Sequence, residues 1–311
     1  MLYFTPITAN AHKYLRSVCK IYKNVGLILS ENQARYRGNE PAGYLTDLPF
    51  TEYMKQLRVD FPGVEIVRDH FTQFYNSAAI EADAMEFDTI HLDPWKPSLS
   101  FNVCVELTIN GIKQFLRVNP NLKFEIGTEY GRYPFTLKQF EDFLKRIDQS
   151  GLGNHISYVV VQSKEGLDLV NAINNVESHP RLEASINIAN SFGFRTKQHN
   201  QDFVDPADFT EKLNLGVNAF NVAPGLARLD NVIAYQNMNW LHKIIYLPKI
   251  LLEPSSHKWI NAKNRTWDLR KYFYAFLHYT DYDNSDQSGK AGHLFNSIYL
   301  PLIKEDENCS R

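Results

Sequence analysis

The sequence contains few cysteines, and their spacing offers no obvious pairing. Its 311 residues include three, Cys19, Cys104 and Cys309, and no Cys-x-x-Cys pair. This excludes a disulfide scaffold and a structural zinc knuckle, because both need paired or clustered cysteines. Such sparse cysteines fit a reducing compartment, and we expect a cytoplasmic protein.

Long apolar stretches and long basic runs are absent as well. No segment approaches the roughly 20 apolar residues that span a bilayer, and the N-terminus lacks the pattern of a signal peptide. The formal net charge is −2, whereas a general nucleic-acid binder needs clustered cations to displace phosphate counterions. We therefore expect a soluble protein whose partner is neither a membrane nor a nucleic acid.

Short apolar runs that end in chemically reactive residues recur along the chain. They span residues 64–70, 89–93, 124–129 and 194–199, and they end in Asp69-His70, Asp93, Glu129 and His199. Longer amphipathic stretches separate them. This alternation is typical of the parallel strands of a β/α barrel, in which reactive groups gather at the C-terminal strand ends.

The whole chain, residues 1–311, is interpreted as a single TIM-type (β/α)8 barrel domain. Residues 1–24 are expected to form an N-terminal capping helix, residues 25–230 the barrel, and residues 231–311 an aromatic-rich helical or irregular extension. Seven strands are expected, near residues 25–29, 64–70, 88–93, 123–129, 156–161, 194–199 and 216–222. Because no equally clear strand follows, the eighth is expected to be short, displaced or missing.

Alternate residues of a barrel strand face the interior, so parity selects the side chains that meet there. The inward sets are Thr89, His91 and Asp93; Glu125, Gly127 and Glu129; and Arg195, Lys197 and His199. Imidazoles and carboxylates that converge suit a divalent metal, for which zinc is the first choice. We expect His70, His199 and Glu129 as ligands, whereas the deeper His91 is expected to satisfy a buried carboxylate.

Three cations near these strand ends have more than one interpretation each. Lys197 is a desolvated Schiff-base nucleophile, the ion-pair partner of Glu125 or Glu129, or a contact for a substrate phosphate. Arg68 and Arg195 either grip a phosphate or carboxylate of the substrate or form salt bridges at the rim.

Several short stretches occur in an order that is more specific than any one of them. They are Asn32-Gln33 with Gly43-Tyr44, Asp69-His70, Ile90-His91-Leu92-Asp93, Ile126-Gly127-Thr128-Glu129, Val159-Val160-Val161-Gln162, His199 with Asp202, and Val222-Ala223-Pro224-Gly225-Leu226. In this order, over roughly residues 25–230, the chain resembles the class II, metal-dependent sugar-phosphate aldolases. It is most similar to the non-catalytic-subunit branch of the tagatose-bisphosphate aldolases.

The resemblance implies that Asp69 is a proton donor and His70 a zinc ligand. At the position of a further zinc-binding histidine of the catalytic aldolases, this sequence has Gln162. Together with the residue pattern, the resemblance leads us to expect catalytic roles for Asp69, Glu129 and Lys197. We expect the substrate to contact six residues: Asn32, Gln33, Arg68, Asp93, Arg195 and Asn221.

The leading hypothesis is a metal-dependent, aldolase-type lyase that acts on a ketose phosphate or bisphosphate, with zinc as cofactor. Three alternatives stay open: a non-catalytic accessory subunit that stabilises a partner aldolase, a Schiff-base aldolase that uses Lys197, and a sugar-phosphate isomerase or epimerase. The chain is expected to form a homo-oligomer or to pair with an aldolase subunit. The C-terminal aromatics, Trp259, Trp267, Tyr272, Phe273 and Tyr274, would form that interface or cover the flank of the barrel.

Overall fold

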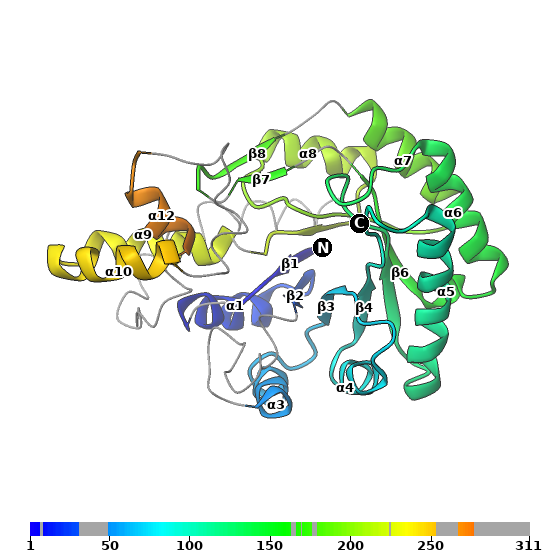
Figure 1. Ribbon diagram of the computed structural model, residues 1–311, viewed down its shortest axis with the longest axis horizontal. Coiled ribbons are helices and arrows are strands. Elements are labelled where there is room, and N and C mark those ends of the chain that lie inside the picture. Colours follow the sequence, from blue (N-terminus) through cyan, green and yellow to red (C-terminus); the bar gives the residue numbers. More distant parts are fainter. Residues whose placement is uncertain are drawn as a thin grey trace.

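A strand at the start of the chain, which the sequence analysis did not predict, closes the barrel. The computed structural model describes residues 1–6, 9–30, 49–162, 166–168, 170–175, 179–223, 225–252 and 267–276. Eight parallel strands form a closed barrel in the order β1-β10-β9-β6-β5-β4-β3-β2 (Figure 1). The expected TIM-type barrel is confirmed, and its eighth strand is displaced to the N-terminus: β1 (Leu2–Phe4) pairs with both β2 and β10.

Strands and helices alternate as the sequence predicted. The further barrel strands are β2 (Val25–Ser30), β3 (Ile66–Phe71), β4 (Thr89–Leu92), β5 (Lys123–Ile126), β6 (Ile156–Val160), β9 (Thr196–Gln198) and β10 (Ala219–Asn221). The helices include α1 (Ala9–Ile21), α3 (Phe50–Asp60), α4 (Ser77–Glu86), α5 (Phe101–Val118), α6 (Leu137–Gln149), α7 (Pro180–Ser191) and α8 (Pro206–Leu215). An antiparallel hairpin that was not predicted, β7 (Gly166–Asp168) with β8 (Ile173–Asn175), lies between β6 and α7.

Side-chain caps define where the helices that cover the barrel begin. Thr136 and Gln139 form a reciprocal capping box at the start of α6, and the Ser100 hydroxyl accepts from the Val103 N–H at the start of α5. Asp205 caps α8 ahead of Pro206. These caps satisfy backbone N–H groups that lack partners within the helix.

The barrel has an apolar outer face and a mixed interior. Strand residues that point outward join the helices in one large hydrophobic core. The interior holds a separate small cluster made of Tyr3, Ile28, Val67, Tyr158 and Ala219. Below it, the carboxylate of Glu65 accepts hydrogen bonds from Tyr3 Oη at 2.5 Å and Thr89 Oγ1 at 2.6 Å.

The C-terminal helices form a second core beside the barrel. Helices α9 (Gly225–Asn237), α10 (Trp240–Leu252) and α12 (Arg270–Phe276) lie together, on the side away from α5 and α6 (Figure 1). Of the C-terminal aromatics, Tyr272 and Phe273 are buried in this core, Trp267 is exposed, and Trp259 falls outside the described residues. Among the described helices, none has the length and apolar character needed to cross a bilayer.

The close approach of β1 to β2 makes Gly26 a test of barrel closure. A Cβ added at Gly26 would lie 2.5 Å from the ring of Tyr3, its partner across the two strands. We expect Gly26→Ala to lower the free energy of unfolding by about 1–3 kcal/mol, as overpacking does. Gly131→Ala is the matched control, because a Cβ there meets nothing within 4 Å. Urea unfolding of both variants checks this, and equal stabilities would contradict the placement of β1.

Candidate active site

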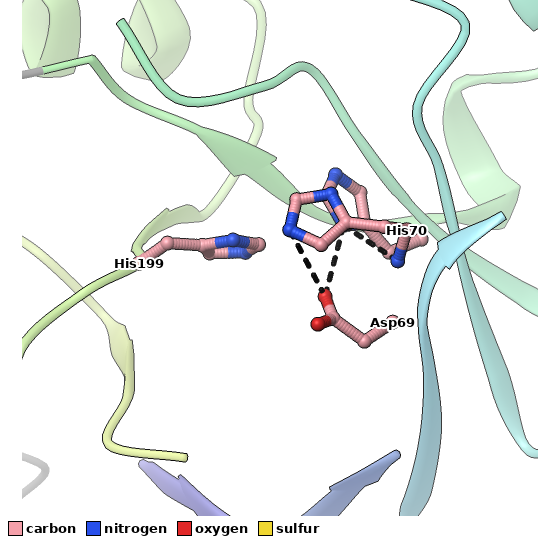
Figure 2. A group of neighbouring side chains, drawn as sticks. Asp69, His70 and His199 are labelled. Carbon is pink, nitrogen blue, oxygen red and sulfur yellow. Dashed lines mark hydrogen bonds and ion pairs between the residues drawn. The ribbon is translucent and has the colours of Figure 1, made fainter. Parts of the chain in front are cut away.

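Imidazole and carboxylate groups gather at the C-terminal ends of β3, β4, β5 and β9. Figure 2 shows Asp69 and the imidazoles of His70 and His199 converging on one region. The ring centroids of these two histidines and His91 lie 4.8 to 5.5 Å apart. One nitrogen of each imidazole and one carboxylate oxygen of Asp69 lie within 4.8 Å of one another.

A β-bulge brings Asp69 and His70 into the site together. Neighbouring residues of a regular strand face opposite sides of the sheet. The pairing of β3 with β4 shifts between Arg68 and Phe71, and His70 adopts a left-handed backbone with φ 47°. Bulges re-aim side chains, and a left-handed non-glycine residue stores strain of the kind found at functional sites.

His91, on β4, is part of the cluster rather than a structural residue beneath it. Its Nε2 lies 3.0 Å from the Gly127 carbonyl, and its Nδ1 lies 3.4 Å from Asp69 Oδ1. Because a carbonyl only accepts, Nε2 carries the proton, and the Nδ1 lone pair faces the cluster, where the His70 backbone N–H donates to it at 3.4 Å. Gly127 has φ 103°, and a Cβ there would lie 3.2 Å from the Val160 carbonyl, so this position favours glycine.

His199, which follows β9, is held between two carboxylates. Its Nε2 contacts Glu125 Oε1, and its Nδ1 lies 3.0 Å from Glu129 Oε1. On the other oxygen of Glu125, Lys197 Nζ donates at 2.7 Å, with both side chains fully buried. Of the interpretations of Lys197, the structure contains the ion pair with Glu125.

Each of the three imidazoles thus has one nitrogen bound to an acceptor behind it. For His70 that acceptor is Asp93, whose Oδ2 lies 2.6 Å from Nδ1. The opposite nitrogen, Nε2, lies 2.9 Å from Glu129 Oε1 and 3.6 Å from Asp69 Oδ1. Hydrogen bonds of this kind fix the ring and the tautomer of metal-binding histidines.

The network shifts the pKa values of its members in opposite directions. Burial by itself lowers the pKa of His199, but the carboxylates of Glu125 and Glu129 outweigh it and raise that pKa to about 9. The pKa of His70 is raised well above its usual value for the same reason, by Asp69 and Glu129. Although burial works in the other direction, the neighbouring imidazoles lower the pKa of both carboxyls, Asp69 and Glu129.

Stability of the metal-free protein should therefore fall as the pH rises from about 6.5 to 9. An unfolded histidine has a pKa near 6.5, so His199, at about 9 in the folded state, stabilises that state fully below about pH 6.5. This contribution is lost as the pH passes through the folded pKa. Urea unfolding of chelator-treated protein should show the fall, and His199→Gln should make it smaller, leaving the contribution of His70. His155→Gln, outside the cluster, is the control; an undiminished fall in His199→Gln would refute the assignment.

Arg68 does not reach the site, which corrects its expected role in binding the substrate. Strand parity places it on the outer face of β3, where it is 1% exposed and Nε donates to Asp83 Oδ2 of α4 at 3.0 Å. Its Nη1 donates to the Asp69 carbonyl. Arg68 therefore anchors the strand beneath the bulge to a helix.

Removal of one charge from this buried pair should be costly. We expect Asp83→Asn to lower the free energy of unfolding by about 3 kcal/mol, because it removes the carboxylate that the buried Arg68 guanidinium contacts. The matched control is Glu106→Gln, which removes one charge from the surface pair with Arg146 and should cost less than about 1 kcal/mol. Chemical denaturation measures both, and similar losses would show that Arg68 is not structurally important.

Arg195 also lies away from the cluster. It precedes β9 at the opposite end of that strand, is exposed, and its guanidinium stacks 4.5 Å from the ring centre of Tyr158. Asn221 does lie at the C-terminal end of β10, where its buried Oδ1 has no hydrogen-bond partner among the described residues. The two other expected substrate contacts, Asn32 and Gln33, fall outside the described residues.

Gln162 has a structural role at the position where the resemblance would place another histidine. Its Oε1 accepts from the Phe135 N–H at 3.0 Å, and its Nε2 donates to the Thr128 and Tyr133 carbonyls at 2.9 and 2.8 Å. It thereby secures the loop between β5 and α6. The third imidazole of the cluster is supplied by His91 from a different strand.

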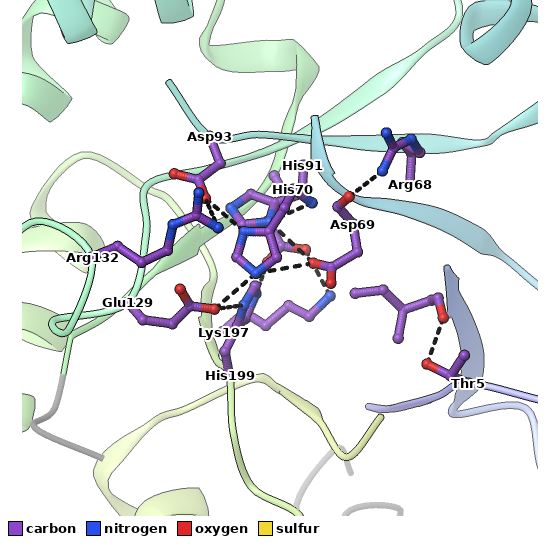
Figure 3. A network of polar contacts seen from close by, with 12 residues as sticks. Thr5, Arg68, Asp69, His70, His91, Asp93, Glu129, Arg132, Lys197 and His199 are labelled. Atoms are coloured by element: carbon purple, nitrogen blue, oxygen red, sulfur yellow. Dashed lines mark hydrogen bonds and ion pairs between the residues drawn. The ribbon is translucent and has the colours of Figure 1, made fainter. Parts of the chain in front are cut away.

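Arg132 is a member of the site that the sequence analysis missed. It lies on the loop after β5, and its Nη1 is 2.9 Å from Asp93 Oδ2 (Figure 3). Strand parity does not predict the direction of a loop side chain, and the spacing between Glu129 and Arg132 does not indicate that the two share a site. By contrast, His91 shares the inward parity of Asp93, and this pattern could have been used to predict His91 as a metal ligand.

Another group of possible metal ligands lies outside the barrel. His179 is bound by Asp208 and Glu211 of α8 at 2.9 and 2.7 Å. Lys212 Nζ lies 2.8 Å from the second oxygen of Asp208. Because a cation already neutralises this group, we interpret it as a link between α7 and α8.

Comparison with known proteins relates the chain to others by fold alone. No protein-family model and no curated sequence matches it. One similar solved structure is a probable tagatose 6 phosphate kinase from Sinorhizobium meliloti 1021, with a TM-score of 0.60 and 15% identity over 99% of this chain and 87% of that one. Another is the fructuronate-tagaturonate epimerase UxaE from Cohnella laeviribosi, with a TM-score of 0.62 and 10% identity over 99% of this chain and 79% of that one. A further one is the fructose-bisphosphate aldolase of Campylobacter jejuni, with a TM-score of 0.57 and 13% identity over 99% of this chain and 90% of that one. Such low identities establish a shared barrel fold.

Proposed function

We propose that this chain is a metal-dependent lyase of the aldolase type that acts on a sugar phosphate. The observation that carries the proposal is the arrangement of His70, His91 and His199. Each has one nitrogen tied to an acceptor behind it and turns the other toward Asp69 or Glu129. Three imidazoles oriented in this way, with carboxylates beside them, form a donor set that suits zinc.

The residues present fit a divalent cation. His70, His91 and His199 would hold it through their inward nitrogens, with Glu129, whose Oε1 lies 2.9 and 3.0 Å from two of those nitrogens, as a further ligand. A metal bound there supplies Lewis-acid stabilisation for the oxyanion that develops on a sugar carbonyl when a carbon–carbon bond breaks.

Asp69 is the proton-transfer group in this proposal. Its lowered pKa keeps it ionised, so it can remove the proton from the substrate hydroxyl in the cleavage direction and return it in the reverse direction. Asn221 is assigned to a substrate hydroxyl, because its buried amide oxygen lies at the same end of the barrel with no hydrogen-bond partner among the described residues.

Lys197 is not proposed as a Schiff-base nucleophile. A Schiff base needs a free neutral amine, whereas Lys197 donates to the fully buried Glu125 and lies 3.6 Å from the ring centre of Tyr3. Borohydride treatment in the presence of substrate should therefore leave Lys197 unmodified.

Epimerisation is a second candidate, favoured by the position of Asp69. An ionised carboxylate beside a metal centre can abstract a proton next to a carbonyl as readily as one from a hydroxyl. One similar fold belongs to a fructuronate-tagaturonate epimerase. Product analysis separates the two reactions, because only the lyase produces two shorter fragments.

Metal content is the first test of this proposal. Protein purified without an affinity metal should contain about one divalent ion per chain by elemental mass spectrometry, because one set of imidazole and carboxylate ligands holds one zinc ion. His70→Ala, His91→Ala and His199→Ala should each lose most of it, and His155→Ala should retain it. Full metal content in all three cluster variants would exclude the site.

Activity is tested with Asp69→Asn on metal-loaded protein. Against a panel of ketose phosphates and bisphosphates, this variant should keep its metal and lose about 100-fold or more of the cleavage rate, as expected for loss of a general acid–base group. A metal-loaded wild-type chain that converts no sugar phosphate would instead favour an accessory subunit, which co-purification with an aldolase would detect.

A further inference from the structure

Two of the three candidate ligand histidines have the same arrangement behind them. His70 contacts the carboxylate of Asp93, and Arg132 Nη1 lies 2.9 Å from the same oxygen. His199 contacts Glu125, whose second oxygen accepts from Lys197 Nζ at 2.7 Å. In both cases the contacts run from an imidazole through a carboxylate to a cation, and Figure 3 shows the series from His70 through Asp93 to Arg132.

His91 differs from the other two in this respect. Behind its ring lies the neutral carbonyl of Gly127, which needs no counter-charge. The two cations, Arg132 and Lys197, are therefore found only behind the rings whose outer nitrogen contacts a carboxylate. Since the side chains of Asp93, Glu125 and Lys197 are fully buried, this arrangement carries a large desolvation cost. An ordinary barrel core would avoid that cost with apolar side chains.

The cation has a definite effect on the carboxylate that it contacts. A guanidinium or ammonium group forms charge-assisted hydrogen bonds with a carboxylate and so holds its rotamer. A carboxylate held in this way fixes the ring in front of it, with one ring nitrogen bound to the carboxylate and the opposite nitrogen turned toward the metal.

We propose that Arg132 and Lys197 are matched positioning residues of the metal centre. Each holds the carboxylate behind one histidine, Asp93 behind His70 and Glu125 behind His199, in the orientation that presents the opposite nitrogen of the ring to a divalent metal. The inference rests on the proposed function. It also gives Lys197 a role that requires the charged ammonium group, which a Schiff-base nucleophile could not keep.

The test is the affinity of the metal-stripped full chain for Co²⁺, measured by competition with a chelator and by the visible spectrum of the bound ion. Arg132→Met and Lys197→Met should each weaken binding about 10- to 100-fold, the usual effect of losing an outer hydrogen-bond partner. Arg132→Lys, which keeps the charge, should recover most of the Arg132→Met loss. Arg146→Met, which removes a surface ion pair with Glu106, should bind as wild type does.

Folding is controlled separately, because Lys197 is fully buried and Arg132 is partly exposed. Urea unfolding of each metal-free variant shows whether the barrel is intact. If Lys197→Met does not fold, the double variant Glu125→Gln/Lys197→Met replaces both charges with neutral groups, a change that buried pairs often tolerate. This double variant should still bind Co²⁺ more weakly and alter its spectrum.

The outcomes separate this inference from the proposed function. If His70→Ala loses Co²⁺ while a folded Arg132→Met and a folded Lys197 variant bind as wild type does, the metal centre stands and the positioning roles are wrong. The positioning role of Arg132 is also wrong if Arg132→Lys binds as weakly as Arg132→Met. If the wild-type chain itself binds no Co²⁺, both the metal centre and the positioning roles are wrong.

Discussion

Four carboxylates lie at or just beneath the C-terminal mouth of the barrel. Their negative charges must be balanced by neighbouring groups, and this requirement determines which side chains surround them. Asp69, Asp93, Glu125 and Glu129 are each in contact with an imidazole nitrogen, and two of them also contact a cation. Loss of any one partner would leave a charge in a region of low dielectric, where an unpaired ion is very costly. The rotamers of the imidazoles, the bulge in β3 and the left-handed backbone of His70 all serve to keep these contacts.

The sequence was sufficient to predict the barrel because the signal there is periodic. Apolar strands alternate with amphipathic helices, and the inward parity of Glu125, Lys197 and His199 agrees with their contacts. The same rule fails where alternation is interrupted. Both Asp69 and His70 enter the site only because of the bulge, and a bulge depends on pairing with the neighbouring strand. Arg68, next to them, was expected to contact the substrate because parity, which places it on the outer face, was not applied to that strand.

Other features could not be predicted, because they depend on contacts between residues far apart in the chain. The role of Arg132 follows from its contact with Asp93, which lies directly after the preceding strand, β4. β1 was missed for a simpler reason: the apolar run around it covers only residues 1–4, whereas the equally short β9 and β10 lie within longer predicted segments. Its buried position becomes evident only when both of its neighbours are present.

Closure by β1 also constrains the order in which the chain can fold. Leu2 pairs with Phe220 on one side and with Val25 on the other. One edge of β1 therefore stays unpaired until residues near Phe220 have been synthesised. The strands from β2 to β6 can assemble in the order of synthesis, but the ring cannot be completed until β10 has left the ribosome. Contacts this distant in sequence slow folding and leave a strand edge unpaired in the meantime. Pairing of β1 with β10 therefore joins segments from opposite parts of the chain and cannot precede the synthesis of β10.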